Sequence, residues 1–158
     1  RSRIVNNTEQ RVYIAVKLIL DNLKSKKIVF CESIKQAELI YQICSESGLN
    51  TSIYHSKLSR SSRIFNLVSF QNNFSSTLIG CKSLDEGFDV PDISLGIIVS
   101  QTKSSRQRIQ RLGRTIRKSD GKIKSKIYTL YTTNEERDIL HEEMLNNPEI
   151  KINWIKPK

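Results

Sequence analysis

Five short apolar runs, rich in β-branched residues, alternate along this chain with longer segments of helical periodicity. A run of this kind between turn signals is typical of a strand that is buried on both faces of a sheet. Strands are expected at residues 27–31, 51–54, 77–81, 94–100 and 126–131. Because strands separated by helices usually pair in parallel, the sequence predicts one α/β domain with a mainly parallel central sheet covered on both faces.

The segments between these runs repeat apolar residues at helical spacing. Helices are expected at residues 8–23, 33–47, 59–70, 105–117 and 134–145. Thr8 and Ser33 are residue types that favour the N-cap position, and Gly48 is the type that ends a helix in a left-handed conformation. The pattern therefore predicts helices between and around the strands.

The chain is expected to contain one domain with short flanking segments. Residues 1–24 should form a leading helix that packs on a domain of residues 25–146, and residues 147–158 should form a tail. The first residue is Arg1 rather than Met, so we expect a part of a longer polypeptide. There is no run of roughly 18 apolar residues, no signal pattern, and no disulfide-like spacing of the three cysteines. We therefore expect a cytoplasmic protein with reduced thiols and no membrane association.

The positive charge is concentrated in one segment. The 158 residues carry 26 Lys or Arg and 16 Asp or Glu, a formal net charge of +10, and residues 101–126 hold 10 of the basic residues and 1 of the acidic ones. A solvated helix face would explain an ordinary run of charge. A concentration this steep favours a polyanionic partner, either nucleic acid or the phosphates of a nucleotide.

Two arginines in this segment have a spacing that suits phosphate binding. Arg114 and Arg117 are three residues apart, so on a helix their side chains project side by side and both guanidinium groups could hold one phosphate. A solvated face remains the alternative. Gly113, directly before them, costs about 1 kcal/mol in a helix relative to alanine, so helix propensity does not account for it.

The irregular segment 82–91 follows an expected buried strand, and open α/β sheets bind ligands at the carboxyl ends of their strands. Gly87 permits close approach of the backbone to a ligand, and Pro91 ends the loop. Asp89 is suited to accept hydrogen bonds from a ribose hydroxyl. The loop is therefore a candidate ligand-binding loop, with an acidic turn between two strands as the alternative.

Four segments of the chain resemble, in order, motifs IV, IVa, V and VI of superfamily 2 helicases. They are the strand at 28–31, His55-Ser56-Lys57-Leu58 with Arg63 and Phe70 downstream, Glu86-Gly87-Phe88-Asp89-Val90-Pro91, and Gln110-Arg111-x-Gly113-Arg114-x-x-Arg117. The agreement spans residues 25–131, and its last motif is the most specific. The stretch from Arg106 to Arg114 is similar to the branch that holds XPB-like and restriction-enzyme-type translocases. The resemblance implies a RecA-like domain, a three-layer α/β/α fold.

In that family two RecA-like domains hold ATP and Mg²⁺ between them, and this chain would be the second domain. The Walker A loop and the acidic box of the first domain are absent from the sequence, so the fragment alone should be inactive. The full-length protein should be an ATP-dependent helicase or translocase. The resemblance implies that Arg114 and Arg117 are arginine fingers, Asp89 contacts the ribose, Gly87 lets the loop pass the nucleotide, and Gln110 links to the acidic box.

The resemblance also implies a nucleic-acid surface built from the loops after the strands of motifs IV and V. Glu32 also lies in these loops but is not assigned as a contact. The residues expected to contact the nucleic acid are Ser33, His55, Arg63, Cys81, Lys82 and Ser83. Cys81 stands where many members have Thr or Ser, so Lys82 would supply the contact to phosphate. We expect DNA to be bound, with RNA as the alternative, and without reading of base order. We expect the first RecA-like domain of the same polypeptide as a second partner.

Three other interpretations are open to test. A basic nucleic-acid-binding module without ATP chemistry would explain the charge but would leave Asp89 and Gln110 without roles. A metal-dependent nuclease is matched by Pro91-Asp92 and Asp120-Gly121-Lys122, although that pattern is short and degenerate. His55 as a metal ligand would have His141 as its only histidine partner and no cysteine at ligand spacing, so no metal site is predicted.

Overall fold

The computed structural model describes residues 2–81, 93–99, 126–145 and 153 of the chain. Within these residues five strands form one parallel sheet, in the order β2-β3-β1-β4-β5. The strands are β1 (Lys27–Cys31), β2 (Thr51–Tyr54), β3 (Thr77–Cys81), β4 (Leu95–Ile98) and β5 (Lys126–Thr129). The predicted α/β class with a mainly parallel sheet is confirmed.

The first three strands have the predicted bounds, whereas β4 and β5 end earlier than expected. Ile98 lies opposite Phe30 on one side and Thr129 on the other, and these are the last paired residues. Beyond them, within the described residues, the Val99 N–H donates to the Phe30 carbonyl at 2.9 Å and the Leu130 N–H donates to the Ile98 carbonyl at 2.9 Å. The apolar run continues past Ile98 and Thr129, but regular pairing does not.

Four helices accompany the sheet in the described residues. They are α1 (Ser2–Asp21), α2 (Ile34–Glu46), α3 (Arg60–Gln71) and α5 (Asn134–Leu145). The prediction of Thr8 as an N-cap is wrong, because α1 begins at Ser2 and Thr8 lies inside it. Gly48 adopts a φ of 74°, as expected of the residue that ends α2. The helix predicted at 105–117 lies outside the described residues.

A buried lysine joins the end of α1 to the start of β1. The side chain of Lys27 is fully buried, and its ammonium group donates to the carbonyls of Asn22 at 2.8 Å and Ser25 at 2.6 Å. Carbonyls at and beyond the carboxyl end of a helix lack helical partners, and a cation there also interacts favourably with the helix dipole. Burial lowers the pKa of Lys27, but these carbonyls replace the hydration that the ammonium group loses.

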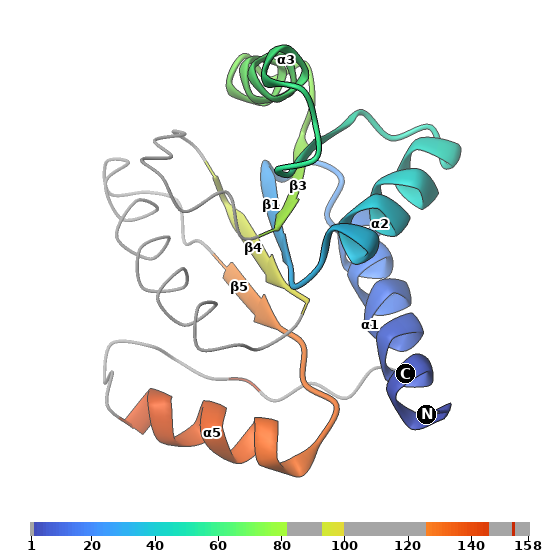
Figure 1. Ribbon diagram of the computed structural model, residues 1–158. Helices are drawn as coiled ribbons and strands as arrows, with labels where there is room; N and C mark the ends of the chain where they lie inside the picture. The colour runs from blue at the N-terminus through green and yellow to red at the C-terminus, as the bar shows by residue number, and fades with distance from the viewer. Residues whose placement is uncertain (1, 82–92, 100–125, 146–152, 154–158) are drawn as a thin grey trace.

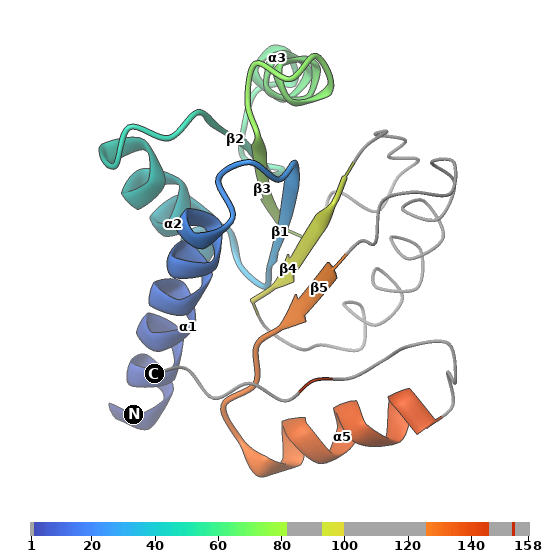
Figure 2. The same cartoon turned by 180° about the vertical axis from the view of Figure 1, so that it is seen from behind.

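The strands bury side chains on both faces of the sheet, and different helices cover the two faces. Val29 and Cys31 pack with residues of α1 and α2, whereas Ile28 and Phe30 pack with Phe70 of α3. Figures 1 and 2 show α1 and α2 side by side, with α3 and α5 near opposite ends of the strand order. This two-sided burial explains why β1, β3 and β4 are mostly apolar instead of alternating between apolar and polar residues.

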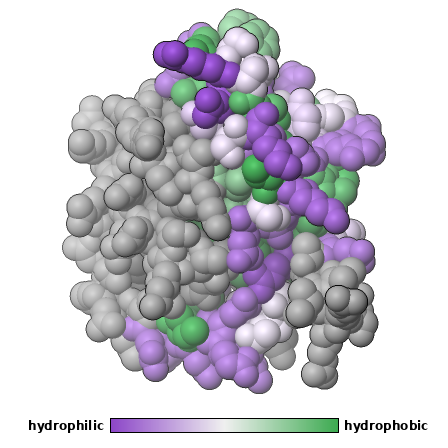
Figure 3. All heavy atoms as spheres, viewed as in Figure 1, coloured by the Kyte–Doolittle hydropathy of each residue, from purple (hydrophilic) through white to green (hydrophobic). Residues whose placement is uncertain are grey.

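Two further observations concern how polar and apolar residues are distributed in the described part of the chain. In Figure 3 the coloured part of the surface is mostly hydrophilic, and the top, over α3, carries apolar residues among hydrophilic ones. None of the described helices combines the length and apolar character that a bilayer crossing requires.

A partly buried ion pair connects α1 with the segment that follows β5. The Arg11 guanidinium lies 2.6 Å from Glu136 Oε1, donates to Thr132 Oγ1 at 2.7 Å, and donates to the Val99 carbonyl at 3.3 Å. The backbone N–H of Thr132 donates to Glu136 Oε2 at 2.7 Å. One arginine from the first helix therefore holds the end of β4 and the start of α5 together.

Candidate nucleic-acid interface

The carboxyl ends of β1, β2 and β3 lie at one edge of the sheet, because the three strands are parallel. Helix α2 begins directly after β1, and α3 begins shortly after β2. The chain leaves the central strand β1 toward β2 and later returns to β4 on the other side of β1. Open α/β sheets bind ligands outside the carboxyl ends at such a reversal of strand order. We call Glu32, Ser33, residues 55–60 and Cys81 the carboxyl edge.

Two helix amino termini face this edge. Ser33 caps α2, its Oγ accepting from the N–H of Gln36 at 3.2 Å, and Ser59 caps α3, its Oγ accepting from the N–H of Ser62 at 3.1 Å. The remaining unpaired N–H groups of a first turn and the positive end of the helix dipole favour phosphate. The predicted contact Ser33 is exposed and lies at this edge, where its hydroxyl also fixes the start of α2.

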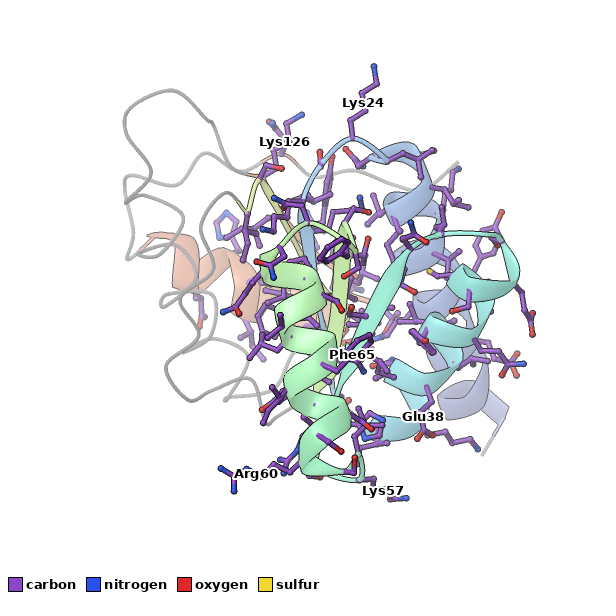
Figure 4. The ribbon with its side chains drawn as sticks, turned by 90° about the horizontal axis from the view of Figure 1, so that it is seen from above. Lys24, Glu38, Lys57, Arg60, Phe65 and Lys126 are labelled. Atoms are coloured by element: carbon purple, nitrogen blue, oxygen red, sulfur yellow. The ribbon has the colours of Figure 1, made fainter. Side chains whose placement is uncertain are left out.

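Exposed cations flank the start of α3. Lys57 and Arg60 are exposed, whereas the predicted contact Arg63 is only partly exposed. Figure 4 shows Lys57, Arg60 and Glu38 at one end of the molecule, and Lys24 and Lys126 at the opposite end. Lys57 and Arg60 were not predicted as contacts from the sequence. The sequence feature that could have identified them is the pair of basic residues on either side of the N-cap Ser59.

His55 reaches the carboxyl edge through its backbone rather than its ring. The side chain is 3% exposed, its Nε2 lies 3.6 Å from Glu38 Oε1, and its Nδ1 has no hydrogen-bond partner in the described part of the chain. The His55 carbonyl accepts from Leu58 N–H at 3.2 Å, which closes the turn that carries Lys57. Burial lowers the pKa of His55; Glu38 opposes this effect and Lys57 adds to it. The imidazole is therefore neutral at neutral pH and supports the turn from inside.

The lowered pKa of His55 predicts a loss of stability in mild acid. The unfolded state binds the proton more tightly, so the free energy of unfolding should fall as the pH drops below about 6.5, by up to about 1.4 kcal/mol for each unit of difference between the two pKa values. Urea unfolding at pH 7.5 and 5.5 measures this change. The His55→Gln variant should lose less stability over the same range, and an equal loss would contradict the assignment.

Cys81 faces the core and not the surface. It is 5% exposed and lies opposite Cys31 in the parallel register of β3 and β1. Both residues belong to the core cluster under α1 and α2, and burial raises the pKa of the Cys31 thiol. All three cysteines are free and buried, as the sequence predicted. A contact to nucleic acid at Cys81 would therefore involve its backbone rather than its thiol.

The predicted nucleotide contacts and part of the predicted nucleic-acid surface lie outside the described residues. These are Lys82, Ser83, Gly87, Asp89, Gln110, Arg114 and Arg117, together with the nuclease-like residues Pro91, Asp92, Asp120 and Lys122. Their roles remain predictions from the sequence.

The two histidines lie at opposite ends of the strand order. His55 follows β2 at one edge of the sheet, and His141 lies on α5, which follows β5 at the other edge. They are therefore not placed to share one metal ion. Within the described ranges, no group of three or more His, Cys, Asp or Glu side chains could hold a metal.

Comparison with known proteins places this geometry in context. Residues 10–119 match the model of the helicase conserved C-terminal domain. DEAD-box ATP-dependent RNA helicase 26 of Oryza sativa is 33% identical over 102 residues, which cover 65% of this chain and 19% of that protein. The chain spans about a fifth of the length of the curated relatives that it matches.

Solved structures share the fold. The C-terminal domain of the DEAD-box protein Dbp5 has a TM-score of 0.76 and 20% identity, with 90% of this chain and 81% of that chain covered. Dbp5 L327V of S. cerevisiae, bound to RNA and ADP BeF3, has a TM-score of 0.74 and 22% identity, with 91% and 38% covered. The RecA-like architecture is thus confirmed.

These comparisons correct two predictions, the kind of nucleic acid and the branch of the helicase family. The preference for DNA is wrong, because the similar proteins named above are an RNA helicase and a helicase bound to RNA. The assignment to the XPB-like or restriction-enzyme-type branch is not supported, because these neighbours are DEAD-box proteins. The branch assignment rested on the local pattern from Arg106 to Arg114 alone.

Proposed function

Because this chain belongs to the helicase conserved C-terminal domain family, we propose that it is the second motor domain of an ATP-dependent RNA helicase. The relatives that are RNA helicases and the RNA-bound relative of the same fold support RNA as the nucleic acid. A first motor domain of the same polypeptide would bind ATP and Mg²⁺. This chain would supply the guanidinium groups of Arg114 and Arg117 and a surface for the RNA backbone.

One observation carries the RNA-binding part of the proposal. The amino termini of α2 and α3 and the exposed cations Lys57 and Arg60 meet at the carboxyl edge of a parallel sheet. Backbone N–H groups, helix dipoles and cations all favour phosphate, and none of them reads a base. This edge is therefore suited to the sugar–phosphate backbone of a single strand, independent of its sequence.

The sheet gives a physical route from nucleotide to RNA. The segment with Gly87 and Asp89 follows β3, and the segment with Arg114 and Arg117 lies between β4 and β5, while the RNA-facing turns follow β1 and β2. All five strands belong to one hydrogen-bonded sheet, so it moves as a unit when two domains close on ATP. Closure would bring the arginines to the triphosphate and shift the RNA-holding edge in the same motion.

The double substitution Lys57→Ala/Arg60→Ala tests the carboxyl edge. We expect it to weaken binding of a fluorescent single-stranded RNA by about tenfold at low salt and to reduce the slope of log affinity against log salt by about 0.7 for each lost phosphate contact. Fluorescence anisotropy over a salt series, with RNAs of different base order, measures both effects.

The matched control removes the same charge from the opposite end of the molecule. Lys24→Ala/Lys126→Ala should leave RNA binding near the wild-type level, because Figure 4 places both lysines away from the carboxyl edge. Equal losses in the two double variants would mean that net charge, not this edge, binds RNA. An unchanged affinity in Lys57→Ala/Arg60→Ala would exclude the edge as the contact surface.

A further inference from the structure

Helix α3 is apolar on its outer face as well as on its inner face. The inner face buries Phe70 and packs Leu67 against the second core cluster. Ile64, Phe65 and Val68 repeat at helical spacing on the opposite side, with exposed fractions of 53%, 71% and 44%. We call these three residues the α3 patch. The inner contacts already hold the helix on the sheet, and the residues of the α3 patch belong to neither core cluster.

The apolar surface extends past the carboxyl end of α3. Phe74 is 75% exposed, and its N–H donates to the Ser69 carbonyl at 2.9 Å, which folds the chain back against the last turn of the helix. Figure 3 shows exposed apolar residues among hydrophilic ones at the top of the molecule, over α3. Contiguous exposed apolar surface with a polar rim is typical of a protein-binding site rather than of a solvated helix.

The charged side chains on α3 and in the turn before it are all basic. Between Ser47 and Cys81 the sequence contains no Asp or Glu, while Lys57, Arg60 and Arg63 lie on α3 or in the turn before it. In Figure 4, Arg60 extends away from the sheet at the start of α3, and Phe65 lies midway along the helix. A second copy of this chain would bring the same cations together, so charge opposes self-association and favours a partner of opposite sign.

We propose that the α3 patch is a docking site for an acidic amphipathic segment of another protein, whose apolar side chains cover Ile64, Phe65 and Val68 and whose carboxylates meet Lys57 and Arg60. Amphipathic helices commonly bind through apolar side chains spaced three and four residues apart, which is the spacing that α3 presents. Phe65 is the one aromatic member of the α3 patch, and the aliphatic Ile64 and Val68 beside it provide no platform for stacking successive bases, so the composition of the α3 patch favours protein over single-stranded nucleic acid.

The direct test uses a labelled helical peptide of about five turns with leucines along one face and glutamates on the other. Two comparison peptides replace every glutamate by lysine or every leucine by glutamine. We expect saturable binding of the first peptide alone to the 158-residue chain, measured by fluorescence anisotropy. Phe65→Ser and Val68→Ser should each weaken it at least about tenfold, and Arg60→Glu should weaken it in a salt-dependent manner.

Exposed positions make these variants suitable. Phe65 is 71% and Val68 44% exposed, so replacing either side chain removes little buried surface and should change the temperature of thermal unfolding only slightly. Tyr13→Ser is the matched control, because Tyr13 is 69% exposed on α1 and lies outside the α3 patch. It should bind the acidic peptide like the wild-type chain.

Four results would overturn the proposal. The lysine peptide could bind as well as the acidic one, or Phe65→Ser could bind like the wild type. Sedimentation could reveal a dimer that Val68→Ser dissociates, which would assign the α3 patch to a second copy. Phe65→Ser and Val68→Ser could weaken the binding of single-stranded RNA as much as the binding of the peptide, which would assign the α3 patch to nucleic acid.

Discussion

In the full-length protein, Arg117→Ala is expected to lower RNA-stimulated ATP hydrolysis at least about tenfold while RNA binding stays close to the wild-type level. If the Arg117 guanidinium meets the γ-phosphate only when two motor domains close, it stabilises charge that develops during phosphoryl transfer. Its removal should therefore reduce kcat more than it raises KM for ATP. Steady-state ATPase assays at saturating single-stranded RNA, with RNA affinity measured in parallel, give both quantities.

A neighbouring lysine provides the control for Arg117. Lys118→Ala removes the same charge one residue along the chain and should have little effect on turnover. Unchanged turnover in Arg117→Ala would remove the arginine-finger assignment. A loss of RNA binding in step with turnover would instead favour a basic binding module without ATP chemistry.

The second large effect is expected at the Arg11–Glu136 pair. Arg11→Met should lower the free energy of unfolding by about 3 kcal/mol, because Glu136 would keep its charge in a partly buried position without its cation. The carbonyl of Val99 and the hydroxyl of Thr132 would lose their donor in the same variant. Urea unfolding at neutral pH measures the change.

Two comparisons separate this pair from general effects of charge. Lys17→Ala removes an exposed cation from the same helix and should change stability by less than about 0.5 kcal/mol. The double variant Arg11→Met/Glu136→Gln should be less destabilised than the sum of the single variants, since it leaves no unpaired charge. Strict additivity would show that the two side chains do not interact energetically.

The free energy of unfolding at acidic pH should also depend on the ionisation of Glu136. Burial alone would raise its pKa, but the hydrogen bonds from Arg11 and from the Thr132 N–H outweigh burial, and the pKa of Glu136 is lowered. The folded state therefore binds this proton less tightly than the unfolded state, so the contribution is present above about pH 4.3 and is lost as the pH falls through the folded pKa.

Local patterns were sufficient to locate most elements of the fold. The bounds of β1 and β3 follow from continuous apolar runs, because each residue of these strands is buried on one face or the other. The start of α3 was expected at Ser59 and lies at Arg60, since the serine side chain is the cap itself. Thr8 was wrongly predicted as an N-cap, because residue type alone does not distinguish a threonine inside a helix from one that caps its start.

The candidate site was less accessible to such reasoning. His55 and Cys81 were assigned by their place in a motif, but the sheet buries both side chains, and no local pattern separates a buried histidine from an exposed one. Lys57 and Arg60 gain their significance only from the neighbouring start of α2, which is more than twenty residues away in the chain.

Periodicity and motif order determined that this chain is a RecA-like α/β domain of the helicase type, because period and order are properties of neighbouring residues. The tertiary structure decided which side chains share a surface. Pairing of β2 with β3 and of β3 with β1 gathers the turns of the carboxyl edge, Arg11 reaches across more than a hundred residues to Glu136, and both depend on contacts that close long loops and so leave no trace in local sequence.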